Sequence, residues 1–118
     1  MARSLVPDPL KRRHLLAGDL DAARASAIAE AYQAEERHIE SIAFFAKAED
    51  EAGLLKLRDL ATSQGDVFLL REVSTALGVA IDEGTWMRTA DAAAAAGLAA
   101  YAEEARRQGD LLAERTNG

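Results

Sequence analysis

Apolar residues recur at helical spacing along most of this chain. One apolar stripe follows residues 20–34 and another follows residues 51–63, with members three and four positions apart. Broader apolar faces, which indicate helices covered on two sides, consist of Ile39, Ile42, Ala43, Phe45 and Ala46 in one segment and of Phe68, Leu69, Leu70, Val73 and Leu77 in another. We expect seven helices, near residues 9–17, 20–34, 36–48, 51–63, 67–77, 84–96 and 98–108, followed by a frayed tail at 111–118.

Residues that end and begin helices separate these segments. The dipeptide Gly-Asp occurs at residues 18–19, 65–66 and 109–110. Glycine readily adopts the left-handed conformation that ends a helix, and aspartate accepts hydrogen bonds from the free amides of the next one. Each dipeptide therefore predicts a helix end followed by a helix start. Further expected capping residues are Asp8, Asp50 and Asp82.

The stretch from residue 27 to residue 50 contains neither glycine nor proline, so one long helix is an alternative to two short ones. Its middle, from Gln33 to Arg37, is too polar for a buried helix interior. We therefore expect a turn there, with a separate helix on each side.

The pattern of large and small residues repeats. A first set recurs about 32 positions later, and a third set is traceable with a shorter turn. This repetition predicts an N-terminal helix within residues 1–18, helix pairs at 19–50, 51–81 and 82–110, and one domain over 1–118. The first set is Ile28, Ala29, Tyr32, Ser41, Phe45 and Ala48; the second is Leu60, Ala61, Gln64, Val73, Leu77 and Ala80; the third is Trp86, Ala90, Ala93, Tyr101, Ala105 and Gln108.

These sets resemble the tetratricopeptide repeat, with Leu57 standing at a bulky position of the second copy. The spacing is shorter than that family's usual 34 residues, the proline that ends its second helix is absent, and Ala25 occupies a position that is usually bulky. The resemblance implies an all-α fold of antiparallel helix pairs, stacked as a short right-handed α-solenoid that binds peptides on its concave face. A compact irregular bundle and other helical solenoids remain alternatives.

Composition and charge narrow the function classes. The chain has 118 residues, a net charge of −6 and no cysteine. A largely acidic surface repels phosphate backbones, so we expect no nucleic-acid partner. The longest uncharged apolar run, residues 92–102, is too short to span a membrane, and no signal-peptide core precedes the first helix. These features predict a cytoplasmic protein.

The candidate chemistry of the sequence is sparse. Glu35 and His38 are three apart and would share a helix face, as in half of a di-iron site. The other histidine, His14, has no acid three residues before it. No hydroxyl residue lies in a glycine-flanked nucleophile elbow, and no glycine-rich phosphate loop occurs. We therefore expect a protein that is not an enzyme and that has no cofactor, no catalytic residues and no metal site.

The remaining class is protein binding. In the repeat register, outward positions on the first helix of each pair form a mixed, somewhat acidic face, which suits a basic or amphipathic peptide or helix of a partner. The alternative is a homodimeric or assembly subunit that associates through its alanine-rich C-terminal helices. The predicted partner-binding residues are Ser26, Glu30, Gln33, Arg58, Thr62, Asp66, Met87 and Asp91.

Overall fold

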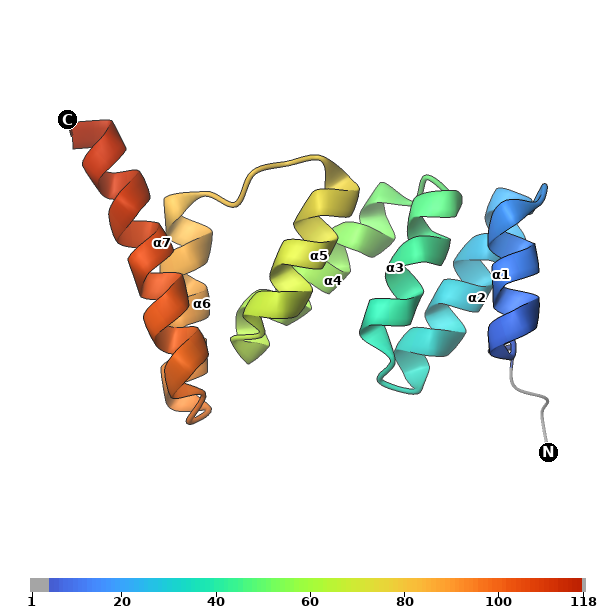
Figure 1. Cartoon of the computed structure of the whole chain (residues 1–118), viewed down its shortest axis with the longest axis horizontal. Helices are drawn as coiled ribbons and strands as arrows, with labels where there is room; N and C mark the ends of the chain where they lie inside the picture. The colour runs from blue at the N-terminus through green and yellow to red at the C-terminus, as the bar shows by residue number, and fades with distance from the viewer. Residues whose placement is uncertain (1–4, 118) are drawn as a thin grey trace. The chain divides into compact units, whose positions relative to one another are not determined.

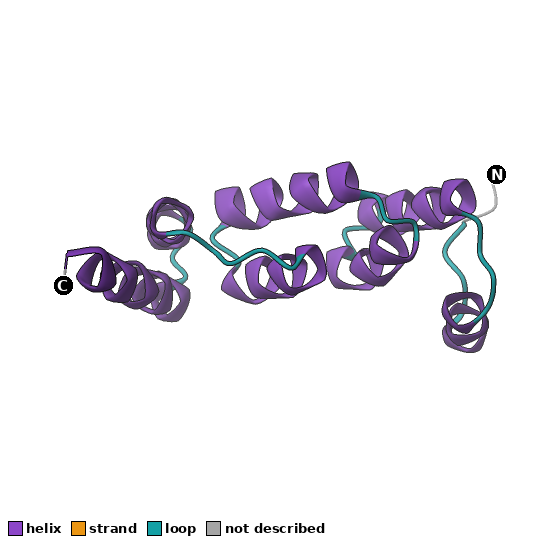
Figure 2. Cartoon of the chain, turned by 90° about the horizontal axis from the view of Figure 1, so that it is seen from above, coloured by secondary structure: helices purple, strands orange, loops and turns teal. Residues whose placement is uncertain are grey.

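The computed structural model describes residues 5–117, with side chains for residues 5–115. Within this range every regular element is an α-helix and none is a β-strand (Figures 1 and 2). The predictions of an all-α fold and of seven helices are confirmed. The helices are α1 (Pro9–Ala17), α2 (Ala22–Ala34), α3 (His38–Lys47), α4 (Glu51–Gln64), α5 (Val67–Leu77), α6 (Glu83–Ala95) and α7 (Ala99–Asn117).

The chain divides into two compact units, and the division falls inside α4, between Leu55 and Lys56. The first unit contains α1, α2, α3 and the first residues of α4. The second contains the rest of α4 together with α5, α6 and α7. Each unit buries its own apolar side chains and is described by itself.

A turn separates α2 from α3, as the polar stretch predicts. α2 continues through Ala34, residues 35–37 form the turn, and α3 begins at His38. The backbone amide of Arg37 donates to the carbonyl oxygen of Tyr32 (2.9 Å), and Glu36 adopts a left-handed conformation with φ 60°. The alternative of one long helix over this stretch is therefore wrong.

Small residues on α2 let the core of the first unit close around three aromatic rings. Ala25 and Ala29 are fully buried and leave room for α3 to approach. The rings of Tyr32 and Phe44 are stacked with centroids 5.6 Å apart, and Phe45 is buried on the same helix. The Tyr32 hydroxyl donates to the carbonyl oxygen of Pro7 (3.4 Å) and so satisfies the polar end of a buried ring.

The buried face of α3 differs from the one that the apolar pattern predicts. Phe44 is absent from the predicted face and is fully buried, whereas Ile39 is 40% exposed and Ala43 and Ala46 are exposed. The small Ser41 is buried in their place, because its hydroxyl donates to the carbonyl oxygen of His38 (2.6 Å) and is thereby satisfied inside the helix. A hydrophobicity pattern does not register a buried serine, so it places the face wrongly.

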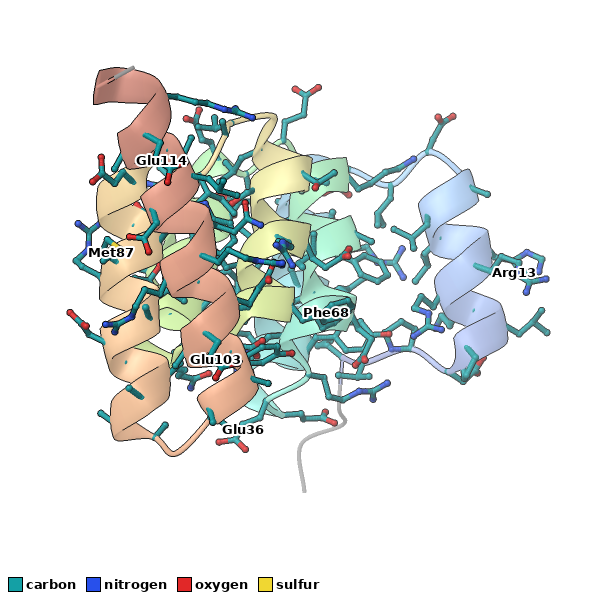
Figure 3. The ribbon with its side chains drawn as sticks, turned by 60° about the vertical axis from the view of Figure 1, so that its left-hand side comes forward. Arg13, Glu36, Phe68, Met87, Glu103 and Glu114 are labelled. Carbon is teal, nitrogen blue, oxygen red and sulfur yellow. The ribbon has the colours of Figure 1, made fainter. Side chains whose placement is uncertain are left out.

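α1 is the most weakly held helix of the first unit, because none of its residues is buried. Asp8 caps it through the amide of Lys11 (2.9 Å), and at its other end the Lys47 ammonium donates to the carbonyl oxygen of Leu16 (3.0 Å). A cation at a helix C-terminus complements the helix dipole. Arg13 projects outward from α1 (Figure 3), consistent with a solvated basic patch.

The second unit buries apolar residues from all four of its helices. α6 and α7 lie side by side, the chain reversing at the turn between them (Figure 1), and α5 also contacts α7. Phe68 is 52% exposed, although the apolar pattern includes it in the face of α5. The largest buried side chains of this core are Leu57, Leu69, Leu70, Val73, Trp86 and Thr89.

The three Gly-Asp dipeptides have different structural roles. Gly18 ends α1, and Gly65 ends α4 with φ +69° before Asp66 caps α5 through the amide of Leu69 (3.0 Å). Gly109, in contrast, lies within α7, which continues to Asn117, so the predicted helix end near 108 is wrong. A Cβ atom on Gly109 would lie 2.5 Å from the Met87 sulfur, which indicates that this glycine permits close packing of α7 on α6.

Replacing Glu36 with glycine is expected to raise the free energy of unfolding by about 0.5–1 kcal/mol, because the left-handed conformation strains any residue with a Cβ atom. Thermal unfolding followed by circular dichroism would measure this change. Glu30→Gly, in the interior of α2, is the matched control and should destabilise the protein. A melting temperature that falls in Glu36→Gly would contradict the turn geometry.

Candidate functional site

The geometry of a helical metal-ligand pair is absent at Glu35 and His38. Glu35 is in the turn and His38 is the first residue of α3, so the two do not share a helix face. The Nδ1 atom of His38 is buried and has no hydrogen-bond partner among the described residues. Across the described residues, no three histidine, cysteine, aspartate or glutamate side chains lie close enough together to hold a metal ion.

Three of the predicted partner-binding residues lie on α2 of the first unit. Glu30 is exposed and Gln33 is half-buried. Ser26 donates its hydroxyl hydrogen to the carboxylate of Asp50 (2.9 Å). Asp50 also accepts the amide hydrogen of Gly53 (2.9 Å), so Ser26 joins α2 to the cap of α4.

Five of the predicted partner-binding residues lie in the second unit, and three of them have structural roles within that unit. Asp66 is the N-cap of α5. Met87 lies on α6 (Figure 3), and its sulfur faces the place where Gly109 lacks a side chain. Asp91 accepts a hydrogen bond from Arg106 on α7 (3.4 Å).

Arg58 and Thr62, the remaining two, are brought together in a hollow between α4 and α6. Its volume is about 310 Å³. Four of its residues come from α4 and three from α6, and we call it the α4–α6 hollow. Its lining consists of Arg58, Asp59, Thr62, Ser63, Thr85, Arg88 and Ala92.

The α6 side of this hollow differs from the predicted binding face. The repeat register predicts Met87 and Asp91 on that face, whereas Thr85, Arg88 and Ala92 line the hollow. These three residues are also spaced three and four apart, so they form an equally regular face, rotated by about one residue. The helical spacing can be recognised in the sequence. Which face of α6 turns toward α4 depends on side-chain packing, which the spacing alone does not determine.

Close packing at the end of α4 brings the two sides of the hollow together. A Cβ atom on Gly65 would lie 2.7 Å from that of Ala93, and even closer to the Ala93 backbone. Ala93 is fully buried. Only glycine satisfies both the left-handed turn and this approach to α6.

The hydrogen bonds around the hollow use most of its hydroxyl groups. Thr62 donates to the carbonyl oxygen of Arg58 (3.0 Å), and Ser63 donates to that of Leu60 (2.9 Å). The hydroxyl oxygen of Thr85 accepts from the Arg88 guanidinium (3.2 Å).

Asp82, the N-cap of α6, lies next to this group. Its carboxylate accepts the amide hydrogen of Thr85 (2.7 Å). That bond is the largest cause of a lowered pKa at Asp82, followed by the Thr85 hydroxyl and then by the charges of Arg88 and Arg58. The arginines therefore act on Asp82 through their charge, while its Oδ1 atom accepts from the Thr85 amide.

A second polar cluster joins α5, α6 and α7. Arg71 on α5 donates to the Glu104 carboxylate on α7 (2.5 Å) and lies over the ring of Trp86 on α6, 5.3 Å from its centroid. Glu104 also accepts from Gln108 (3.2 Å) and from Arg107. The hydrogen bond from Arg71 is the main reason that the pKa of Glu104 falls to about 2, and partial burial opposes the shift.

Glu104→Gln is expected to lower the free energy of unfolding by about 1 kcal/mol at neutral pH, because it removes a charge shared by several donors. A lowered folded-state pKa stabilises the fold above the unfolded-state value of 4.5, and this contribution disappears as the pH falls through about 2. Urea titrations across this interval should therefore show the wild type and the variant converging. Glu114→Gln, further along α7 (Figure 3), is the control. A constant difference at all pH values would contradict the assignment.

The alanine-rich turn between α6 and α7 forms another hollow, of about 400 Å³. Ala94 and Ala99 line it and are exposed, and the neighbouring Leu98 is 41% exposed. Its polar rim consists of Glu103, labelled in Figure 3, and Arg106. We call this surface the alanine turn.

None of the helices in residues 5–117 combines the length and the hydropathy that a membrane crossing requires.

Comparisons with models of known protein families, with curated proteins and with solved structures find no match to this chain. The resemblance to the tetratricopeptide repeat therefore stays a prediction carried by the motif residues.

Proposed function

We propose that the chain is a non-enzymatic protein-interaction module, which docks a peptide or helix of a partner protein in the α4–α6 hollow. The observation that carries this proposal is the hollow itself, where Arg58 and Thr62, predicted as binding residues, lie opposite Thr85 and Arg88. Concave sites with a few convergent polar groups are typical places for a ligand or a partner side chain.

The packing of the second unit supports stacked helix pairs. The turn after α4 packs against α6, and α5 contacts α7, so like members of two successive pairs are neighbours. This is the relation expected of a short right-handed solenoid resembling the tetratricopeptide repeat, in which the first helices of the pairs line the binding face. In that arrangement the hollow lies on the binding face.

Binding is favoured over catalysis by what the hydroxyl groups of the hollow do. Thr62 and Ser63 donate their hydrogens to backbone carbonyl oxygens of α4, and Thr85 is engaged with Arg88. A nucleophilic hydroxyl instead needs hydrogen-bond contact with a general base. The lining therefore supplies fixed polar surface and charge.

Site-specific photo-crosslinking tests the proposal. A photoreactive amino acid at Ser63, an exposed residue of the hollow, should yield one or a few defined protein adducts in cells that express the chain. The matched control is the same amino acid at Ala76, exposed on α5 and outside the hollow lining. Identical adducts from both positions, or none from Ser63, would refute docking at the hollow.

A second candidate function is homodimerisation through the alanine turn. The favouring observation is that Leu98 and the adjacent alanines are exposed beside a hollow instead of being covered within the second unit. Size-exclusion chromatography with light scattering should then give a dimer that Leu98→Glu dissociates. A monomer at high micromolar concentration would eliminate this candidate.

A further inference from the structure

We propose that the α4–α6 hollow recognises a carboxylate on the partner segment, the side chain of an aspartate or glutamate, and that Arg58 and Arg88 hold it between them. This inference rests on the proposed function and specifies the chemistry of the docked group. It differs from the basic or amphipathic partner suggested by the predicted face as a whole, because the charge of the hollow is local.

The first observation is that neither arginine forms a close ion pair with a described carboxylate, although the charges of both act on the nearby Asp82. Arg71, Arg106 and Arg107 in the same unit each form an ion pair. Among the described residues, no carboxylate oxygen lies within 4.0 Å of a guanidinium nitrogen of Arg58 or Arg88. Arg58 is also half-buried, so part of its side chain is held against the wall of the hollow.

The second observation concerns the hydrogen-bond donors that remain available. The hydroxyls of Thr62 and Ser63 donate to their own helix, so they present only acceptor lone pairs to the hollow. Arg88 uses one donor on Thr85, which leaves several of its N–H groups and those of Arg58. The side-chain donors available in the hollow are those of the two guanidinium groups, and the planar fork of an arginine matches a carboxylate.

The third observation is the unfavourable position of Arg88. Its guanidinium folds back over the first turn of α6, where a Cβ atom on Gly84 would lie 3.3 Å from the Arg88 Nη1 atom. The N-terminus of a helix carries partial positive charge, so a cation there is disfavoured. The Asp82 carboxylate at the same N-terminus offsets part of this repulsion, and a bound anion would offset more of it.

The net charge of the lining favours a carboxylate over a phosphate. Arg58 and Arg88 contribute two positive charges and Asp59 contributes one negative charge, which leaves one positive charge. The nearby Asp82 carboxylate brings the local charge to zero. A carboxylate therefore adds one negative charge to the site, whereas a phosphate dianion adds two.

Titration with defined peptide pools tests the inference. The pools are capped and randomised except at a central residue, which is glutamate, glutamine, phosphoserine or lysine. Nuclear magnetic resonance of the arginine Nε–Hε groups reports binding at Arg58 and Arg88. The glutamate pool should bind about tenfold more tightly than the glutamine pool, since a charged hydrogen-bonded pair is lost.

Variants assign the effect to the two arginines. Arg58→Gln and Arg88→Gln should each weaken binding of the glutamate pool about tenfold and leave the glutamine pool unchanged. Arg88→Lys keeps the positive charge but lacks the planar fork of donors, so its affinity for the glutamate pool should lie between those of the wild type and Arg88→Gln. Arg115→Gln, on the exposed end of α7, is the matched control and should bind as the wild type does. Circular dichroism of each variant verifies that it is folded.

Several outcomes would overturn the inference. Equal binding of the glutamate and glutamine pools, or no binding of either, would show that the hollow does not recognise a carboxylate. Tighter binding of the phosphoserine pool assigns the site to phosphate. If specific adducts at Ser63 persist in Arg58→Gln and Arg88→Gln, the proposed docking function stands and only this inference fails.

Discussion

Gly65→Ala is expected to destabilise the second unit by about 2–4 kcal/mol. An alanine in the left-handed conformation costs about 1 kcal/mol, and forcing a methyl group into a packed contact adds about 1–3 kcal/mol. Both apply here, because Gly65 has φ +69° and its added Cβ atom would collide with Ala93. The measurement is urea unfolding followed by the fluorescence of Trp86, the only tryptophan and a buried residue of the second unit.

Gly78→Ala is the matched control for this prediction. Gly78 has φ +68°, nearly the same backbone strain, and no atom lies within 4 Å of its added Cβ atom. Its replacement should therefore cost about 1 kcal/mol from the backbone alone. Equal losses in the two variants would show that the turn after α4 does not press against α6, and the α4–α6 hollow would lose its structural basis.

Phe44→Ala is expected to cost about 3–5 kcal/mol, the range for removing a buried phenylalanine ring. Phe44 is fully buried and stacks on Tyr32, so its removal leaves a cavity and takes away the ring that packs against Tyr32. Urea unfolding followed by far-ultraviolet circular dichroism measures the change, because this signal includes the helices of the first unit, whereas Trp86 fluorescence reports only the second.

Phe68→Ala is the corresponding control with the same change of side chain. Phe68 is 52% exposed, so its replacement should cost no more than about 1 kcal/mol. The two variants also distinguish the observed cores from those that the apolar pattern predicts, because that pattern includes Phe68 in a buried face and omits Phe44. A larger loss for Phe68→Ala than for Phe44→Ala would contradict the described cores.

Local signals predicted several helix starts, although the N-cap of α2 is Asp21 and not Asp19 of the first Gly-Asp dipeptide. The carboxylates of Asp8, Asp50 and Asp82 each accept an amide hydrogen in the first turn of a helix, as their positions predict. Such a cap depends only on neighbouring residues. Gly109 shows the limit of this reasoning, because it resembles Gly65 in sequence but serves contact with Met87 on another helix.

The candidate site was only partly predictable for the same reason. Arg58 and Thr62 follow from the repeat register, which fixes one face of α4. Arg88 lies on an equally regular face of α6, and only packing decides which face meets α4. The absence of an ion pair at Arg88 is likewise a property of three-dimensional distances, which the order of charges along the chain does not contain.

The most direct test of the central claim is to map the docked partner on the chain. The segment crosslinked from Ser63 would be synthesised and titrated into isotope-labelled protein, and amide chemical-shift changes would be recorded. We predict that the changes concentrate on the hollow-lining residues of α4 and α6, including Arg58 and Arg88. Changes confined to the alanine turn, or scattered over α1, would contradict a docking function for the α4–α6 hollow.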